Sequence, residues 1–288
     1  DGDRSNTAWR EFFRDEYKMN AAIHHYPKPY IAFMDGITMG GGVGVSVHGD
    51  YRIVTERTML AMPETGLGLM PDVGGGYFMP RLEGELGMYL ALKGERIKAA
   101  DCMDFGIATH FMESEQQYQL IERLSRVETV EEVGRVIGGM SGNAGNGKVA
   151  IYRDDIDGMF AGTSVEEIMA ALKEDGDTWA MAQYDAMAKL SPTSMKVTFK
   201  QMRDGEHLSF DEEMKVELRI LSHIIEGHDF YEGVRAVLVD KDNKPQWNPA
   251  TLKQVSAAAV GRPFAPPDRG GRAFHCSSPS STTNCTTT

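Results

Sequence analysis

The chain has 288 residues, of which 41% are hydrophobic and 25% are charged. This composition is close to that of ordinary globular proteins, and the length allows one large domain or two smaller ones. The formal net charge of -12 opposes attraction to nucleic acid and to anionic lipid, because both carry the same sign. We therefore expect no nucleic-acid partner, and an anionic ligand would need a local cluster of cations or helix N-terminal amides.

The cysteines and the lengths of the apolar runs further limit the classes of protein to which the chain can belong. Cys102, Cys276 and Cys285 form neither a disulfide framework nor a paired metal-ligand spacing, so we expect no metal site and a reducing compartment. No apolar run approaches the roughly 18 to 20 residues of a membrane-spanning helix, so no membrane partner is expected. The chain opens without Met and without signal-peptide character, so a targeting segment could have been removed.

The first predicted elements form one supersecondary unit. Residues 9–25 place aromatic and apolar side chains at helical spacing among charges and stop at two prolines, which predicts an amphipathic helix. Residues 29–35 are an apolar run typical of a buried strand, and the glycine-rich residues 36–42 predict a turn. A short helix over residues 43–48 and a strand over residues 51–55 are expected to follow.

A loop punctuated by glycine and proline, residues 64–76, comes next and is a natural place for function. Helical patterning over residues 77–92 follows it. Residues 98–111 suggest a short helix and a strand, and residues 115–136 predict a charged amphipathic helix. The soft stretch 138–147 is rich in glycine and predicts a subdomain boundary.

We divide the chain into a partial α/β core at 1–140, a linker at 141–150, a helical region at 151–256 and a tail at 257–288. In the helical region, Ser164 opens a candidate capping box. Helices are predicted there over residues 168–172, 178–190, 194–202 and 210–225. The end of the chain is rich in Pro, Arg, Ser and Thr without periodicity, which predicts disorder.

Three consecutive glycines, Gly40, Gly41 and Gly42, lie between a predicted strand and a predicted helix. Backbone N–H groups at such a helix start can stabilise a developing oxyanion, and glycine lets the backbone approach a substrate closely. A tight turn with close strand-to-helix packing explains the same pattern. The triplet alone leaves both interpretations open.

Glu64 and Asp72 lie eight residues apart in the proline-flanked loop. Such a loop could turn both carboxylates towards one cleft, one as base or nucleophile and the other as an orienting group. Charged loop residues are mostly exposed and solvated, which is the competing interpretation. Glu16, on the first predicted helix, has a weaker case, because acids are common on helix surfaces.

Three other patterns suggest chemistry but lack parts of their motif. Residues 142–148 approach a phosphate-binding loop, yet Val149 replaces the Ser or Thr that binds magnesium, so we expect a linker. Ser46 misses the nucleophile-elbow pattern by one position and is expected to be structural. The histidine pairs His24–His25 and His223–His228 have no convincing ligand set, so local hydrogen bonding or exposure is expected.

Several segments of the sequence together resemble a known protein family. Residues 28–44, from Lys28-Pro-Tyr-Ile-Ala-Phe-Met-Asp to the glycine triplet, resemble an oxyanion-hole segment of the crotonase superfamily. Residues 61–82, together with Gly106-Ile-Ala-Thr-His-Phe, resemble the 3-hydroxyisobutyryl-CoA hydrolase branch. Residues 190–194 and 227–247 resemble that branch too, so that the resemblance covers about residues 9 to 256.

The resemblance implies a crotonase-like (ClpP/crotonase) α/β spiral core that lacks its first strands, followed by a helical C-terminal region. It implies hydrolysis of a short 3-hydroxyacyl-CoA, with Gly41 offering an oxyanion N–H and Glu64 as the catalytic carboxylate. Asp72 would hold the substrate hydroxyl or polarise the nucleophile, and Glu16 would contact the substrate. No cofactor is implied because CoA is part of the acyl-CoA substrate. A homo-oligomer and a mitochondrial location in valine catabolism are further implications.

Two departures from the family pattern and two rival functions stay open. Family members begin with strands and a segment that supplies the second oxyanion N–H, of which only Asp1-Gly2-Asp3 is a candidate remnant. Loss of one such donor costs about 10²- to 10³-fold in turnover, so we predict that the chain as given is impaired or unstable. After about Ser256 the sequence leaves the pattern. An enoyl-CoA hydratase or isomerase and a non-catalytic scaffold are the rivals.

Overall fold

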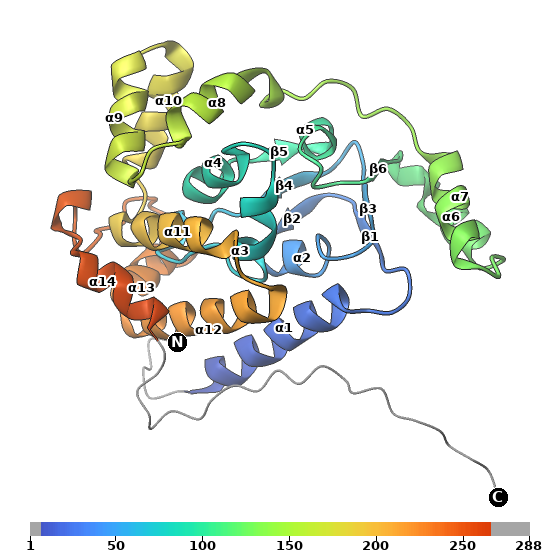
Figure 1. Cartoon of the computed structure of the whole chain (residues 1–288), viewed down its shortest axis with the longest axis horizontal. Coiled ribbons are helices and arrows are strands. Elements are labelled where there is room, and N and C mark those ends of the chain that lie inside the picture. Colours follow the sequence, from blue (N-terminus) through green and yellow to red (C-terminus); the bar gives the residue numbers. More distant parts are fainter. Residues whose placement is uncertain (1–6, 266–288) are drawn as a thin grey trace, which may run out of the picture.

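The computed structural model describes residues 7–265 (Figure 1). The predictions for residues 1–3, for Cys276 and Cys285 and for the tail after residue 265 lie outside the described residues. Among the helices of the described part, none combines the length and the apolar character that a membrane crossing requires.

Helix α1 (Ala8–His24) confirms the first predicted element. Its charged face points to solvent, whereas Tyr17, Ala21 and Ile23 are buried. The helix packs along α12 (Phe210–Glu226), as Figure 1 shows, although the two are separated by most of the chain. Of the acids on α1, Glu16 is partly buried, whereas Glu11 and Asp15 are exposed.

The strands form two small sheets. The first is parallel in the order β1-β3-β6, and its central strand is fully buried at Ile53 and Val54. The second has the order β2-β4-β5, with β2 and β4 parallel and β5 antiparallel to β4. The bounds are β1 Ile31–Met34, β2 Ile37–Met39, β3 Tyr51–Val54, β4 Met59–Ala61, β5 Ile97–Lys98 and β6 His110–Phe111.

Two predicted helices of the core are shorter or broken. The helix expected over residues 43–48 is a single turn, α2 (Gly41–Gly44), that begins two residues earlier because Gly40 takes φ 50° and starts it. The helix expected over residues 77–92 divides into α3 (Gly75–Phe78), a 3-10 turn and α4 (Leu86–Lys93). Gly84, with φ 60°, reverses the chain between them because a left-handed residue cannot continue a right-handed helix.

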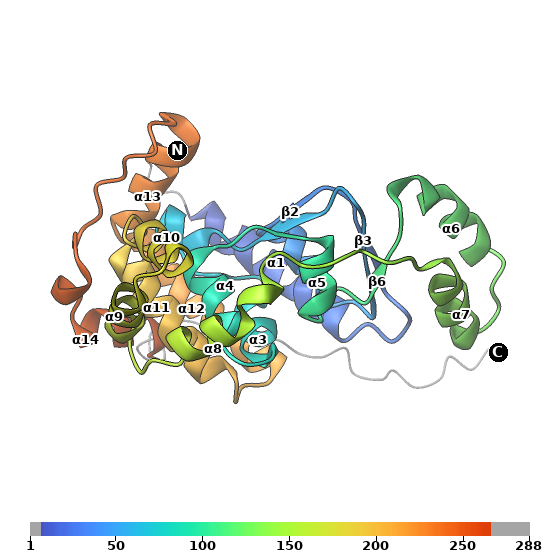
Figure 2. The same cartoon turned by 90° about the horizontal axis from the view of Figure 1, so that it is seen from above.

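The amphipathic helix expected over residues 115–136 is also two helices, α6 (Gln117–Leu124) and α7 (Val130–Met140). Thr129 causes the break, since its side chain accepts a hydrogen bond from the Glu132 N–H and starts a new helix with a capping box. Figure 2 shows this hairpin at one end of the molecule, beyond β6. A separate small buried cluster, which includes Ile53 and Ile137, joins the hairpin to the first sheet.

The C-terminal half is helical. Its helices are α8 Arg153–Phe160, α9 Val165–Asp175, α10 Thr178–Met187, α11 Pro192–Gly205, α12, α13 Asp229–Val234 and α14 Ala257–Gly261, and α5 (Ala99–Asp104) precedes the hairpin. Helix α11 packs against α3 and α4, so the main buried cluster contains residues of both halves, such as Met62 and Leu218. The division of the chain into separate domains stays a prediction.

The tail expected from residue 257 requires a correction. Ser256 caps α14 by accepting a hydrogen bond from the Ala259 N–H, and Pro263 is buried. Helix α14 packs on α11, and the 3-10 turn after it packs on α12. Disorder was the wrong prediction for residues 257–265, because three alanines and a cap favour a helix that apolar packing then holds.

Candidate active site

Glu64 begins a 3-10 turn (Glu64–Leu67) directly after Pro63. Its neighbour Thr65 fixes the turn from both sides: the Thr65 hydroxyl donates to the Leu92 carbonyl at 3.0 Å, and the Thr65 carbonyl accepts from the Ser191 N–H at 3.2 Å. The Glu64 side chain is only 5% exposed, yet its Oε2 atom has no hydrogen-bond partner among the described residues. A buried carboxyl with a free oxygen is unfavourable for stability and suits a group that awaits a ligand.

The glycine triplet lies beside this carboxyl. The Gly40 carbonyl accepts hydrogen bonds from the Val43 and Gly44 N–H groups, which form the single turn of α2. No hydrogen bond engages the Gly41 N–H within the described residues. A side chain at position 40 would have its Cβ 3.6 Å from Oε1 of Glu64. The start of α2 and the Glu64 carboxyl therefore adjoin each other, as the sequence predicted for one shared site.

Glu16 reaches the same place from α1. A Cβ atom at Gly41 would lie 2.8 Å from Oε1 of Glu16, which is closer than real contacts allow. A larger residue at position 41 would therefore displace the Glu16 carboxyl, which is the end of a flexible side chain. Burial raises the pKa of the Glu16 carboxyl above its ordinary value.

Asp72 completes the group from the far end of the loop. It is 5% exposed, and its Oδ2 accepts a hydrogen bond of 2.9 Å from the Tyr17 hydroxyl. Burial raises the pKa of Asp72 to about 7; the hydrogen bond from Tyr17 opposes this rise and the nearby Glu16 adds to it. The structure therefore gathers all four predicted residues, Glu16, Gly41, Glu64 and Asp72, around one point.

The same buried environment raises the pKa of the Glu64 carboxyl. Burial raises the pKa of the Glu64 carboxyl well above its ordinary range, and the negative charge of Asp72 raises it further. Two acids in a water-poor site cannot both ionise easily, since each charge disfavours the other. Around neutral pH the pair favours at least one protonated carboxyl, which is an arrangement suited to proton transfer.

Three residues that support the loop were missed by the sequence analysis. The carboxylate of Glu217 accepts hydrogen bonds from the Gly74 and Gly76 N–H groups, at 2.9 and 3.0 Å. Nε2 of His48 lies 2.7 Å from the Val73 carbonyl oxygen, and the Gln201 amide donates to the Pro71 carbonyl at 2.9 Å. Burial lowers the pKa of His48 to about 4, so a neutral ring donates this bond at pH 7.

A signal for Glu217 was present in the sequence. Phe210, Met214, Leu218 and Leu221 form the buried stripe of α12, and helical spacing places Glu217 within that stripe. An acid on the apolar side of a helix is unusual and needs a partner. No pattern marked His48 or Gln201, because their partners are backbone atoms of a distant loop.

The three rejected patterns have the structural roles that we expected. Residues 141–147 contain no helix or strand, and the Gly147 N–H donates to Asp104, so an acid occupies the place where a phosphate would bind. The Ser46 hydroxyl donates to the Gly42 carbonyl at 2.7 Å. Among the histidines, His24 stacks on Phe210 with ring centroids 4.1 Å apart, and His228 pairs with Asp229.

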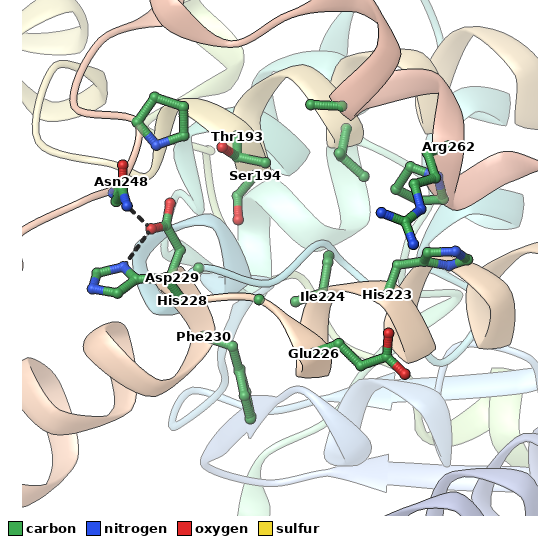
Figure 3. A pocket seen from close by; sticks show the side chains of 16 residues that line it. Thr193, Ser194, His223, Ile224, Glu226, His228, Asp229, Phe230, Asn248 and Arg262 are labelled. Carbon is green, nitrogen blue, oxygen red and sulfur yellow. Dashed lines mark hydrogen bonds and ion pairs between the residues drawn. The ribbon is translucent and has the colours of Figure 1, made fainter. Parts of the chain in front are cut away.

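A separate cavity of about 440 Å³ lies between α11, α12, α13 and α14 (Figure 3). Figure 3 shows Asp229 engaged by His228 and by the Asn248 N–H, at 3.0 and 2.8 Å. Its lining includes Gly68 but none of the four predicted site residues. The buried acid of its lining, Asp229, is hydrogen-bonded, whereas Oε2 of Glu64 has no partner among the described residues.

A family model described as enoyl-CoA hydratase/isomerase matches residues 1–264. The chain belongs to this family. Among curated relatives, it is 46% identical to the mitochondrial 3-hydroxyisobutyryl-CoA hydrolase of Danio rerio, over 92% of this chain and 71% of the relative. For the proteins of the same name from Xenopus laevis and Homo sapiens, identity is 49% and 45%, over 86% and 88% of this chain and 66% and 67% of theirs. The chain thus spans about two thirds of the length of these relatives.

Solved structures of the enoyl-CoA hydratase/isomerase family confirm the crotonase-like fold. A carnitinyl-CoA dehydratase from Mycobacterium thermoresistibile superposes with a TM-score of 0.84 at 37% identity, over 91% of this chain and 75% of that one. An enoyl-CoA hydratase from Rhodobacter sphaeroides 2.4.1 gives 0.81 at 33% identity, over 89% and 74%. The α/β core followed by a helical C-terminal region is therefore the architecture of the family.

Proposed function

We propose that this protein hydrolyses the thioester of 3-hydroxyisobutyryl-CoA, or of a closely related short 3-hydroxyacyl-CoA, to the free acid and CoA in valine catabolism. The observation that carries the proposal is the buried Glu64 carboxyl, whose Oε2 has no partner among the described residues and whose Oε1 adjoins the start of α2. The relatives named 3-hydroxyisobutyryl-CoA hydrolase support the choice of substrate.

In the general-base route, ionised Glu64 takes a proton from water while the water oxygen attacks the thioester carbon. The carbonyl oxygen becomes an oxyanion, and the Gly41 N–H donates a hydrogen bond to it. Collapse of this intermediate breaks the C–S bond, and protonated Glu64 returns the proton to the thiolate of CoA. The raised pKa of Glu64 suits both steps, because the carboxyl is a stronger base when ionised and holds the proton until sulfur leaves.

In the nucleophilic route, Glu64 itself attacks the thioester carbon and CoA leaves as the thiolate. The resulting mixed anhydride is then hydrolysed by water, which restores the carboxyl. Both routes use the same residue and the same oxyanion donor. They differ in whether Glu64 forms a covalent bond to the acyl group; oxygen from labelled water can enter the Glu64 carboxyl only in the nucleophilic route, when water attacks the Glu64 carbonyl carbon of the anhydride.

Asp72 and Glu16 are proposed to place the substrate. Asp72, already oriented by the Tyr17 hydroxyl, would accept a hydrogen bond from the 3-hydroxyl group or polarise the nucleophile. Glu16 borders Gly41 and would contact the acyl part. Because CoA is part of the substrate, the proposed steps use no separate cofactor or metal. A homo-oligomer stays a prediction, and the names of the relatives support a mitochondrial location.

Hydration of an enoyl-CoA is the second candidate, because two well-superposed structures carry the titles of a dehydratase and a hydratase. Their acids would handle water or protons at carbon without cleaving the thioester. Product analysis of the full-length protein separates the two reactions: hydrolysis frees one thiol per turnover, whereas hydration retains the thioester absorbance. Thiol release from 3-hydroxyisobutyryl-CoA supports the proposal, and thioester retention with loss of the enoyl signal contradicts it.

A scaffold protein that kept the fold without catalysis is the remaining rival. The unpartnered oxygen of Glu64 argues against it in combination with the position of this carboxyl beside the start of α2, where a substrate carbonyl could bind both. Titration of the protein with an acyl-CoA decides this point. Saturable binding agrees with a substrate site, and its absence favours the scaffold.

A further inference from the structure

The segment that follows Asp72 has an unfavourable backbone. Val73 has φ 49° and Gly74 has φ 88°, so two successive residues occupy the left-handed region. A β-branched residue is rarely found there because its side chain crowds the backbone. The surrounding structure must therefore hold this segment in place, and it does so immediately next to a proposed site residue.

The anchors of this segment come from two directions. From the α2 side, the His48 ring lies against it: a Cβ atom at Gly74 would be 2.4 Å from His48 Nε2, and the same nitrogen bonds the Val73 carbonyl. From the α12 side, Glu217 binds the Gly74 and Gly76 N–H groups with one oxygen each. The intervening Gly75 N–H bonds the Asp72 carbonyl at 2.8 Å, so each of the three amides has an acceptor.

Glu217 is a costly residue for this task. It is 0% exposed, and no cationic side chain pairs with it among the described residues. Its other hydrogen-bond neighbour is the Gln201 amide at 3.4 Å, which also bonds the Pro71 carbonyl just before Asp72. A buried carboxyl without a cation contributes poorly to stability, so we look for its role in the Gly74 and Gly76 amides that it binds.

We propose that Glu217 is a positioning residue for Asp72: by binding the Gly74 and Gly76 amides it fixes the backbone from which the Asp72 side chain points into the site. Glu217 thereby serves recognition of the substrate's 3-hydroxyl group without touching the substrate. This inference rests on the proposed function in assigning the hydroxyl contact to Asp72. The backbone role of Glu217 is independent of that assignment.

Glu217→Gln tests the inference with little change of shape. A glutamine offers one acceptor oxygen in place of two and turns an NH₂ group towards the second amide, so the segment should loosen. We measure kcat/KM of the full-length protein for 3-hydroxyisobutyryl-CoA and for isobutyryl-CoA, which lacks the hydroxyl. The expected result is a loss of about tenfold for the hydroxylated substrate and less than about twofold for the other.

Glu213→Gln is the matched control. Glu213 lies one turn away on α12, is equally buried and also contacts the Gln201 amide; its Oε1 atom lies beside Gly76 but makes no hydrogen bond to the segment. Glu213→Gln should leave unchanged the ratio of kcat/KM for 3-hydroxyisobutyryl-CoA to kcat/KM for isobutyryl-CoA. Asp72→Asn should lower this ratio at least as much as Glu217→Gln does. An equal loss for both substrates in Glu217→Gln means general structural damage and overturns the inference.

Hydrogen exchange of the unaltered protein provides a readout without activity or mutation. The Gly74 and Gly76 amides should exchange as slowly as those within α4, and Glu217→Gln should accelerate them while α9 is unaffected. Fast exchange of these amides in the unaltered protein overturns the inference even if the variant fails to fold. A further outcome is that the protein frees no thiol from either substrate while these amides exchange slowly in the unaltered protein and faster in Glu217→Gln. In that case the proposed function fails and the backbone role of Glu217 stands.

Discussion

The buried acids around the loop, among them Glu217 of α12, and the acids of the α6–α7 hairpin are the same residue types in different environments. Glu132 at the start of α7 is partly exposed to solvent, and the hydrogen bonds that it accepts from the Glu128 and Thr129 N–H groups lower its pKa. Glu217 also accepts two backbone N–H groups, yet burial and the neighbouring acid Glu213 raise its pKa well above normal. The comparison shows that removal of water outweighs two hydrogen bonds. Acids that stabilise helices remain in water, and acids proposed for chemistry do not.

The largest expected effect is on activity, which should depend on the buried acid Glu64 and not on the hairpin acid Glu132. Glu64→Ala should lower the rate of thiol release by about 10²- to 10⁴-fold, because it removes the proposed base or nucleophile. The isosteric Glu64→Gln should do the same while keeping the fold, as judged by thermal melting. Glu132→Gln is the surface control and should leave the rate unchanged. Comparable rates in Glu64→Gln and the unaltered protein would remove Glu64 from the mechanism.

The second effect tests the contact between Gly41 and Glu16. Gly41→Ala should reduce turnover by about tenfold or less, because its Cβ would lie 2.8 Å from Oε1 of Glu16, the end of a flexible side chain that would have to move aside. If the clash is the cause, Glu16→Asp in the same chain, which shortens the side chain and keeps the carboxyl, should restore part of the turnover. A double variant that is no faster than Gly41→Ala alone would mean that the added methyl acts on the substrate instead.

The third effect is a difference in how stability depends on pH. The folded pKa of Asp72 is about 7, above its ordinary value of 3.8, so the folded protein retains a proton that the unfolded chain has lost. This burial cost is absent below about pH 4, grows as pH rises and is complete above about pH 7. Its full size is at most about 4 kcal/mol of unfolding free energy, at roughly 1.36 kcal/mol per pKa unit.

Asp72→Asn should therefore lose less stability than the unaltered protein between pH 4 and pH 7, as measured by chemical denaturation. Glu132 has the opposite sign: its pKa is lowered, so its contribution is present above its unfolded pKa and is lost as pH falls through the folded one. Glu132→Gln should thus differ from the unaltered protein least in acid. Parallel stability curves for Asp72→Asn and the unaltered protein would show that Asp72 ionises normally.

The smallest effect concerns the hairpin alone. Thr129→Ala removes the side chain that accepts the Glu132 N–H and should lower the unfolding free energy by about 1 kcal/mol. The ratio of activity between hydroxylated and unhydroxylated substrates should not change, since the hairpin packs on its own small cluster beyond β6. A change in that ratio would show that the hairpin and the site are coupled.

The site was largely predictable because its parts are local in sequence. Glycines in a row and acids in a stiff loop are recognisable one segment at a time, and family resemblance assigned roles to Gly41, Glu64 and Asp72. Helix ends were less predictable: Thr129 divides one expected helix into α6 and α7, and Gly84 divides another. In both places a single capping or left-handed residue outweighs the hydrophobic periodicity around it.

The sequence by itself indicated the candidate site residues, the mixed α/β class and the start of most helices, since periodicity, capping and glycine content act over a few residues. Only the tertiary structure raises the pKa values of Glu64 and Asp72 and brings Tyr17, His48 and Glu217 into contact with the loop. The physical reason is that burial and long-range hydrogen bonds depend on which distant segments pack together. Tyr17 and Asp72 are 55 positions apart, and Glu217 and Gly74 are 143 apart, so no local pattern contains either pair.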